Sequence, residues 1–260
     1  MSRAVLITGS GARLGAHLAK GLAQDGWHII IHYKSSVNRA EALRSEINSH
    51  GGKADIITAD LSKAEDTKVL IKRCHALVDM PLNALINNAA MFTPDRATDF
   101  NTENYETQMR VNLSAPLILA REFAAQHGAG QNRNIINIID QRVLRPNPMY
   151  FSYSLSKAGL YWATKTMAQD FAPHIRVNAI GPGPTLKNTT QSSDEFAQEE
   201  KANLLRHGSP PEDILRGVRY LLSARSVTGQ MIAIDSGQHL NWDTADNQLD
   251  TAFDPYRGKS

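Results

Sequence analysis

A tyrosine, a lysine and an aspartate stand where they could deliver a proton to a substrate. Tyr153 and Lys157 are four residues apart, so they share one face of a helix. A phenol titrates near pH ~10 and donates poorly at pH 7 until a neighbouring cation stabilises its phenolate. Asp140 precedes Tyr153 by thirteen residues and ends an apolar run. Together the three side chains predict a catalytic site with Tyr153 as general acid.

The N-terminal segment supplies elements that could hold a cofactor beside these residues. Residues 4–8 are apolar and rich in β-branched side chains, which is typical of a buried parallel strand. They lead into Gly9, Gly11 and Gly15, then an amphipathic helix, and residues 28–33 form a second apolar strand. This order predicts the first βαβ unit of a dinucleotide-binding fold, with the pyrophosphate at the helix N-terminus.

The same alternation continues through the chain. We expect further helices at about 40–47, 66–78, 103–126, 150–171 and 214–222, and strands at 54–58, 82–87, 134–139, 175–180 and 231–234. The pattern predicts an α/β fold, a single-domain Rossmann-type doubly wound parallel sheet with helices on both faces. Ligands bind such sheets at the carboxyl ends of the strands, where we place Gly9, Asp60, Asn88, Asp140 and Pro182.

Five motifs fall in the order and spacing of a known family. They are the segment Thr8 to Gly15, the turn Asn87-Asn88-Ala89-Ala90, Asn112, the pair Tyr153 and Lys157, and the dipeptide Pro182-Gly183. On these motifs the chain resembles the short-chain dehydrogenase/reductase family over about residues 3–240.

Within that family the chain resembles the pteridine reductase group. Arg13 stands where most members have the middle glycine, and Asp140 stands where most have the catalytic serine. Phe92 follows the Asn-Asn-Ala-Ala turn where the group has an aromatic residue that stacks on the pterin. The end of the second strand, residues 32–36, is also similar to that of the group.

The resemblance implies a full set of site residues. The implied catalytic residues are Asn112, Asp140, Tyr153 and Lys157, with Asn112 holding a water that leads to solvent. The implied substrate contacts are Arg13, Phe92, Asp140 and Tyr153. The implied cofactor contacts are Gly9, Gly11, Arg13, Leu14, Gly15, Tyr33, Lys34, Ser35, Ser36, Asp60, Leu61, Asn88, Ala89, Ala90, Tyr153, Lys157, Pro182 and Gly183.

Charge at the end of the second strand indicates the cofactor. Enzymes that select NAD place a carboxylate there to bind the ribose 2′-hydroxyl. This chain has Lys34, Ser35 and Ser36 instead, and its next acid is Glu41. Lys34, the two serines and Arg13 are suited to a 2′-phosphate, so we expect NADPH.

Asp140 indicates the substrate. An ionised carboxylate repels the oxyanion that develops when a ketone is reduced, whereas it suits a substrate with N–H donors or ring nitrogens that need protons. A dihydropterin offers both, so we expect NADPH-dependent reduction of a C=N bond in a pterin-like small molecule. Two alternatives stay open: a carbonyl reductase acting on a ketone, sugar or acyl thioester, and a non-catalytic regulator that binds NADPH.

Two segments depart from the regular alternation. Residues 186–207 form a polar insert after a strand, which we interpret as a lid over the substrate within a catalytic domain of residues 1–240. Residues 241–260 form a mostly polar C-terminal tail, for which disorder and contact with a neighbouring subunit both stay open; Trp242, Phe253 and Tyr256 favour docking.

Composition indicates the cellular compartment and the classes of partner to expect. A net charge of +2 in 260 residues gives no argument for nucleic acid, and no apolar run reaches the ~18 residues of a membrane span. The single cysteine, Cys74, fits a reducing compartment, and the strand that begins within a few residues of Met1 leaves no room for a signal peptide. We therefore expect a cytoplasmic protein. The histidines show no ligand spacing, so we expect no metal.

The helices that carry Asn112 and Tyr153 are more apolar than one core face requires. Proteins similar to this one pair such helices across two-fold axes, so we expect a homotetramer. The apolar residues in question are Leu117, Ile118, Leu119 and Phe123 on the first helix and Leu160, Trp162 and Met167 on the second.

Overall fold

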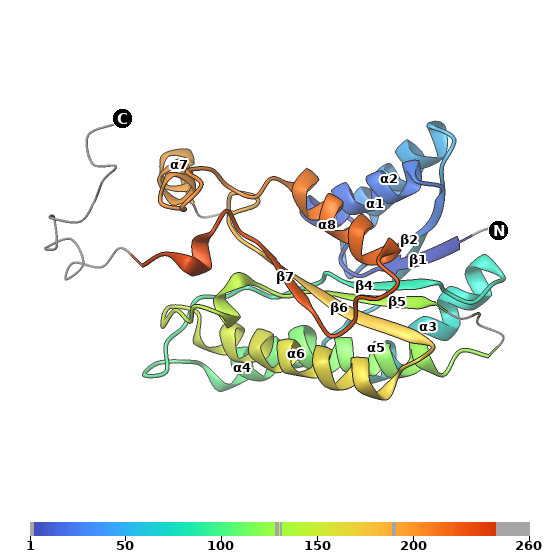
Figure 1. Ribbon diagram of the computed structural model, residues 1–260. Coiled ribbons are helices and arrows are strands. Elements are labelled where there is room, and N and C mark those ends of the chain that lie inside the picture. The colour runs from blue at the N-terminus through green and yellow to red at the C-terminus, as the bar shows by residue number, and fades with distance from the viewer. Residues whose placement is uncertain (1–2, 128–129, 131, 189–190, 243–260) are drawn as a thin grey trace, which may run out of the picture.

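A single parallel sheet forms the centre of the protein. The computed structural model describes residues 3–127, 130, 132–188 and 191–242, and Figure 1 shows their arrangement. In these residues the sheet has the strand order β3-β2-β1-β4-β5-β6-β7, with every neighbouring pair parallel. The strands are β1 (Arg3–Ile7), β2 (Trp27–Tyr33), β3 (Lys53–Thr58), β4 (Ala84–Asn87), β5 (Arg133–Ile138), β6 (Ile175–Pro182) and β7 (Met231–Ile234). The expected fold class is confirmed.

Helices cover both faces of this sheet. They are α1 (Arg13–Gln24), α2 (Val37–Ser49), α3 (Ala64–Val78), α4 (Thr102–Met109), α5 (Ala115–Ala124), α6 (Phe151–Asp170), α7 (Ser193–Lys201) and α8 (Pro211–Ser223). In Figure 1, α1, α2 and α8 lie on one face and α3 to α6 on the other, whereas α7 lies apart near the ends of β6 and β7. Short helical turns, η2 (Gln141–Val143) and η3 (Gln238–Leu240), follow β5 and β7.

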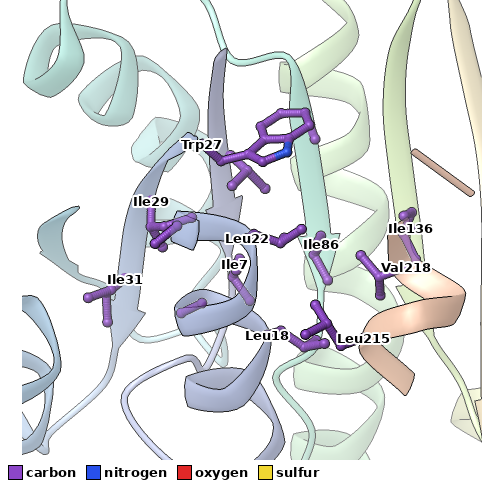
Figure 2. Packing of buried hydrophobic residues seen from close by; sticks show 14 of the residues in the cluster. Ile7, Leu18, Leu22, Trp27, Ile29, Ile31, Ile86, Ile136, Leu215 and Val218 are labelled. Carbon is purple, nitrogen blue, oxygen red and sulfur yellow. The ribbon is translucent and has the colours of Figure 1, made fainter. Parts of the chain in front are cut away.

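Each face of the sheet has its own apolar core. Figure 2 shows the first cluster, in which Leu18 and Leu22 of α1 and Leu215 of α8 pack against the isoleucines of β1 and β2. The second cluster joins the opposite sheet face to Leu70 of α3 and Phe123 of α5. Burying one such side chain contributes about 1.5–3 kcal/mol. The two layers therefore hold the carboxyl ends of the strands in fixed positions.

The order in which strands are added to the sheet reverses between β1 and β4. Strands β2 and β3 lie on one side of β1, and strands β4 to β7 lie on the other. Connections after β1 and β4 consequently lead away from each other, which opens a crevice at their carboxyl ends. This crevice is where the sequence places the glycine turn and Asn88.

The long helix expected at 103–126 is not one regular α-helix. It consists of α4, a π-helical segment η1 (Arg110–Ser114) and α5. Asn112 lies inside η1, where its Oδ1 accepts a hydrogen bond from the Met91 N–H (2.7 Å) and its Nδ2 donates to the Met91 carbonyl (2.9 Å). Apolar periodicity does not reveal such a segment, because one widened turn barely changes the pattern. A π-helical turn is common at functional sites, and this one contains the residue that makes these bonds.

Several other boundaries differ from expectation by a few residues. Helix α2 extends beyond 40–47 at both ends, and β6 continues to Pro182 rather than ending at 180. The polar insert 186–207 contains a helix, α7, whose first turn is closed by a capping box between Ser192 and Glu195. Residues 189–190 of the insert and 243–260 of the tail lie outside the described residues. No helix in the described part of the chain has the length and apolar character needed to cross a membrane.

Candidate active site

A cavity of about 440 Å³ opens at the carboxyl ends of the strands. Residues from the glycine turn, the loop after β4, the end of β5, α6 and the segment after β6 meet there. The lining includes thirteen of the residues expected from the sequence: Gly9, Arg13, Leu14, Gly15, Asn88, Ala89, Ala90, Phe92, Asp140, Tyr153, Lys157, Pro182 and Gly183.

The glycine turn approaches its neighbours too closely for side chains. Gly9 has a φ of +64°, and a Cβ on Gly15 would lie 2.7 Å from the Asn88 Nδ2 and from the Gly9 carbonyl oxygen. Asn88 in turn donates to the Thr8 carbonyl (2.8 Å) and so ties the turn after β1 to the loop after β4. These contacts fix the turn as a backbone cradle beside the N-terminus of α1, a position suited to the pyrophosphate of a dinucleotide.

His32 holds the glycine turn in place through hydrogen bonds. Its Nδ1 accepts the Gly9 N–H at 2.9 Å, and its Nε2 donates to the Ala59 carbonyl at 3.1 Å. Burial lowers the pKa of His32 to about 4, so the ring is neutral at pH 7 and carries its proton on Nε2. The residue was identified in the sequence only as part of a strand end. Its contacts make it the support of the turn.

Tyr153 and Asp140 form a direct pair inside the cavity. The Tyr153 hydroxyl donates to the Asp140 Oδ2 at 3.0 Å, and both side chains are almost completely buried. Burial, followed by the charge of Asp140 and this hydrogen bond, raises the pKa of Tyr153 well above 10. The phenol is therefore protonated at neutral pH, and its raised pKa also makes it a weaker acid than a free phenol.

Lys157 does not contact the phenol oxygen. Its Nζ donates to the Ile138 carbonyl at 2.8 Å and lies 5.7 Å from the centre of the Tyr153 ring. Burial lowers the pKa of Lys157 to about 8. The largest influences on the pKa of Tyr153 are its burial and Asp140. The expected influence of Lys157 on the phenol stays a prediction.

Arg142 neutralises Asp140. Asp140 caps η2, so its Oδ1 accepts the backbone N–H of Arg142 at 2.8 Å, while the Arg142 Nη1 donates to its Oδ2 at 3.0 Å. A guanidinium keeps its proton in proteins, so Arg142 forms an ion pair with Asp140 inside the cavity. Arg142 was not among the site residues expected from the sequence. The capping position of Asp140, two residues earlier, is the local signal that could have indicated it.

The expected pterin-stacking residue already has an aromatic partner. Phe92 stacks on Tyr150, with ring centres 4.3 Å apart and an angle of 12° between the planes. The rings of Phe92 and Tyr153 are nearly perpendicular, with centres 4.7 Å apart. Phe92 lines the cavity, and Tyr150 packs against it.

Arg13 contacts the start of the lid. Its φ is +52°, a left-handed conformation that is uncommon outside glycine, and its Nη2 donates to the carbonyls of Leu186 (3.2 Å) and Lys187 (3.0 Å). The guanidinium thus bridges the glycine turn and the insert. Further along, the insert lines the cavity with Gln191, Phe196 and Glu199, none of which was expected from the sequence. The serine and glutamate three residues apart at the start of α7 were the signal for this helix.

Some expected site residues lie outside the cavity lining: Gly11, Tyr33, Lys34, Ser35, Ser36, Asp60, Leu61 and Asn112. Lys34 pairs with Asp60 at 3.1 Å beyond the end of β2. Asn112 is fully buried, and both hydrogens of its amide are used by Met91 and the Ser156 hydroxyl (3.1 Å). Asn112 therefore shapes the backbone beside the cavity.

The fold and this cavity together define a class, the dinucleotide-binding α/β proteins. A short chain dehydrogenase family model matches residues 3–199, and the chain belongs to this family. Among curated relatives, an uncharacterized oxidoreductase of Methylorubrum extorquens is 31% identical, with 90% of this chain and 97% of the relative covered. A 3-oxoacyl-[acyl-carrier-protein] reductase, FabG, of Staphylococcus epidermidis is 28% identical over 92% of this chain and its own full length.

Solved structures agree with this assignment. FolM alternative dihydrofolate reductase 1 from Brucella suis, in complex with NADP, is 39% identical with a TM-score of 0.90, covering 94% of this chain and 98% of that one. A blue fluorescent protein from a metagenomic library, in complex with NADPH, is 27% identical with a TM-score of 0.83, covering 90% and 97%. The resemblance inferred from the sequence is confirmed for the family and extends to a structure described as a dihydrofolate reductase.

Proposed function

We propose that this protein is an NADPH-dependent reductase of a dihydropterin-like C=N bond. The observation that carries the proposal is the hydrogen bond from Tyr153 to Asp140 in a buried cavity. Asp140 forms an ion pair with Arg142, accepts hydrogen bonds and repels a developing oxyanion. A substrate with amino and ring N–H donors satisfies such a carboxylate, whereas a ketone oxygen does not.

Each residue then has a role that matches its contacts. NADPH, when bound, supplies the hydride. Tyr153 donates the proton to the substrate nitrogen, and Asp140 accepts an N–H from the substrate. Phe92, with one face on Tyr150, forms an aromatic wall against which a flat ring can pack.

The proposal of NADPH rests on charge and on two similar structures. No acid occupies the end of β2, where Lys34 and two serines stand. The Brucella suis and metagenomic structures are described as complexes with NADP and NADPH. The cradle around Gly9 and Gly15 fits the pyrophosphate that this cofactor shares with NADH.

A panel of acceptors tests the proposal. NADPH oxidation is measured by absorbance with dihydrobiopterin, dihydrofolate, dihydromonapterin and a set of ketones. We expect oxidation with the pterins, and a loss of at least ~10²-fold in Tyr153→Phe, the usual scale of general acid catalysis, with NADPH affinity retained. Oxidation with ketones alone contradicts the proposal, and tight NADPH binding without turnover indicates a regulator.

The second candidate is a carbonyl reductase. It is favoured by the 3-oxoacyl-[acyl-carrier-protein] reductases, at 27–28% identity over more than nine tenths of this chain. The same panel, extended with a 3-oxoacyl thioester, separates it from the first candidate.

A further inference from the structure

Four ionisable side chains line the same part of the cavity. Tyr153 and Lys157 come from α6, and Asp140 and Arg142 come from the turn after β5. Tyr153 and Arg142 both donate to the same carboxylate oxygen, Asp140 Oδ2, each at 3.0 Å. The ion pair is well shielded, because the side chains of Arg142 and Asp140 are 19% and 12% exposed.

This geometry creates a difficulty for proton donation. When Tyr153 gives its hydroxyl proton to an acceptor, the oxygen left behind is a phenolate beside the ionised Asp140. Two anions at hydrogen-bond distance repel strongly in a buried site. The step is feasible only where a nearby cation compensates the additional negative charge.

Arg142 is the cation in contact with that point. The Lys157 ammonium donates to the Ile138 carbonyl, lies over the Tyr153 ring and interacts with the charge of Asp140 without a hydrogen bond to it among the described contacts. The Arg142 Nη1, by contrast, is bonded to the oxygen that also accepts the Tyr153 hydrogen. The Arg142 charge also opposes the rise in the pKa of Tyr153 that burial and Asp140 cause.

Aromatic rings hold the guanidinium in this place. The Arg142 Cζ lies 5.2 Å from the centre of the Tyr150 ring and 5.5 Å from that of Phe92. A cation over an aromatic face is stabilised by the ring quadrupole. The Phe92–Tyr150 stack therefore contacts Arg142 on one side while Asp140 binds it on the other.

We propose that Arg142 is a positioning residue that compensates the charge of Asp140 and so allows Tyr153 to release its proton. The inference rests on Tyr153 as the proton donor of the proposed function, and it holds for whichever acceptor is reduced. In the step itself a hydride adds to the acceptor carbon, the Tyr153 proton adds to the adjacent nitrogen or oxygen, and NADPH is oxidised to NADP⁺.

Kinetics of three variants test the inference. Arg142→Gln removes the charge and keeps a hydrogen-bond donor, Arg142→Lys keeps the charge, and Arg216→Gln removes an exposed guanidinium on α8 as a control. With the acceptor that the wild type reduces fastest, we expect Arg142→Gln to lower kcat at least ~10-fold, the effect of one pKa unit. Its solvent deuterium isotope effect on kcat should also rise, because proton release becomes slower.

The lysine variant shows whether Arg142 acts through its charge or only through its packing. Arg142→Lys should recover a large part of kcat with a wild-type isotope effect, and Arg216→Gln should match the wild type. The dissociation constant for NADPH should be unchanged in all three variants. Unchanged kcat in Arg142→Gln, or equal losses in the Gln and Lys variants, overturns the inference.

A titration without substrate keeps this test separate from the proposed function. Asp140→Asn removes the charge that resists phenolate formation and brings ionisation of Tyr153 to lower pH, where ultraviolet difference spectra against Tyr153→Phe can follow it. Adding Arg142→Gln to Asp140→Asn should move that ionisation to higher pH. If it does not move, Arg142 exerts no charge effect on Tyr153, whatever the acceptor panel shows.

Discussion

At the scale of single residues, the chemistry of the site depends on which ionisable side chains contact one another. Asp140 receives hydrogen bonds from Tyr153 and Arg142 and is therefore an acceptor within the cavity. Lys157 binds the end of β5 through the Ile138 carbonyl. In the proposed function, proton donation therefore belongs to Tyr153 and substrate anchoring to Asp140.

Replacing Asp140 should separate pterin reduction from ketone reduction. Asp140→Ser offers a neutral hydroxyl that can bond a carbonyl oxygen, so we expect loss of at least ~10²-fold in dihydropterin turnover and a gain in ketone turnover. Asp140→Asn should lose pterin turnover as well, because an amide removes the charge and half of the acceptor capacity. The measurement is kcat for one dihydropterin and one ketone, with NADPH affinity as the control. Equal pterin rates in the three proteins contradict an active role for Asp140.

Lys34 should determine the choice between NADPH and NADH. The side chain is 63% exposed and pairs with Asp60 at the end of β2, so a 2′-phosphate can compete for it. Lys34→Glu should lower kcat/KM for NADPH at least ~10-fold and invert the preference toward NADH, since a carboxylate repels the phosphate. Lys34→Gln is the matched control, because it removes one charge without adding another. Equal kcat/KM for the two cofactors in the wild type argues against this prediction.

At the scale of elements, two local departures from regular structure shape the site. The π-helical turn at Arg110–Ser114 brings Asn112 to the backbone of Met91, beside the cavity. At the end of β1, the turn with Gly9 in a left-handed conformation is held by His32 of β2. Both departures are supported by buried side-chain hydrogen bonds.

His32 should make the stability of the glycine turn depend on pH. Its pKa is about 4 in the folded protein and 6.5 in the unfolded chain, so the unfolded chain takes up the proton first as pH falls. The stability contribution is present above pH 6.5 and is lost between pH 6.5 and 4, by about 3 kcal/mol in total. Urea unfolding across this range measures it. His32→Gln should flatten the dependence, whereas replacing the exposed His50 in the same way should leave it unchanged.

At the scale of the whole molecule, the apolar surface of α6 is the feature that the single chain leaves unexplained. Trp162 is 67% exposed and Leu155 is 43% exposed on this helix. Leu119, Phe123 and Leu160 do not support assembly, because they are buried within the chain's own core. Trp162 does support it, and so does Leu155, which was not among the residues expected from the sequence.

We predict a homotetramer in which α6 lies at a subunit interface. Light scattering at micromolar concentration should give about four times the mass of one chain. Trp162→Glu should reduce that mass, because it places a charge on the apolar face, while Lys68→Glu, an exposed change on α3, should not. A monomeric wild type at this concentration refutes the prediction.

The sequence alone determines the order of elements and the residues at the strand ends. Periodicity of two and of 3.6 residues distinguishes strands from helices wherever one side is buried, which is why β1, α1 and β2 agree with expectation within one or two residues. Glycines at 9 and 15 indicate the turn because only glycine fits its close contacts. Tyr153 and Asp140 are brought together because consecutive parallel strands and helices deliver their ends to one edge of the sheet.

Only the tertiary structure decides which side chains are partners. Arg142 could equally have pointed to solvent, and Arg13 could have remained at the glycine turn rather than reaching the carbonyl of Leu186. Side-chain direction depends on backbone angles and on neighbours that are distant in sequence, such as Tyr150 for Phe92. For the same reason, the chain order predicts a phenol with a lysine near it, whereas packing surrounds that phenol with a carboxylate and a guanidinium. Local sequence patterns determine whether each segment forms a helix, a strand or a turn, and long-range packing determines which ionisable side chains contact one another.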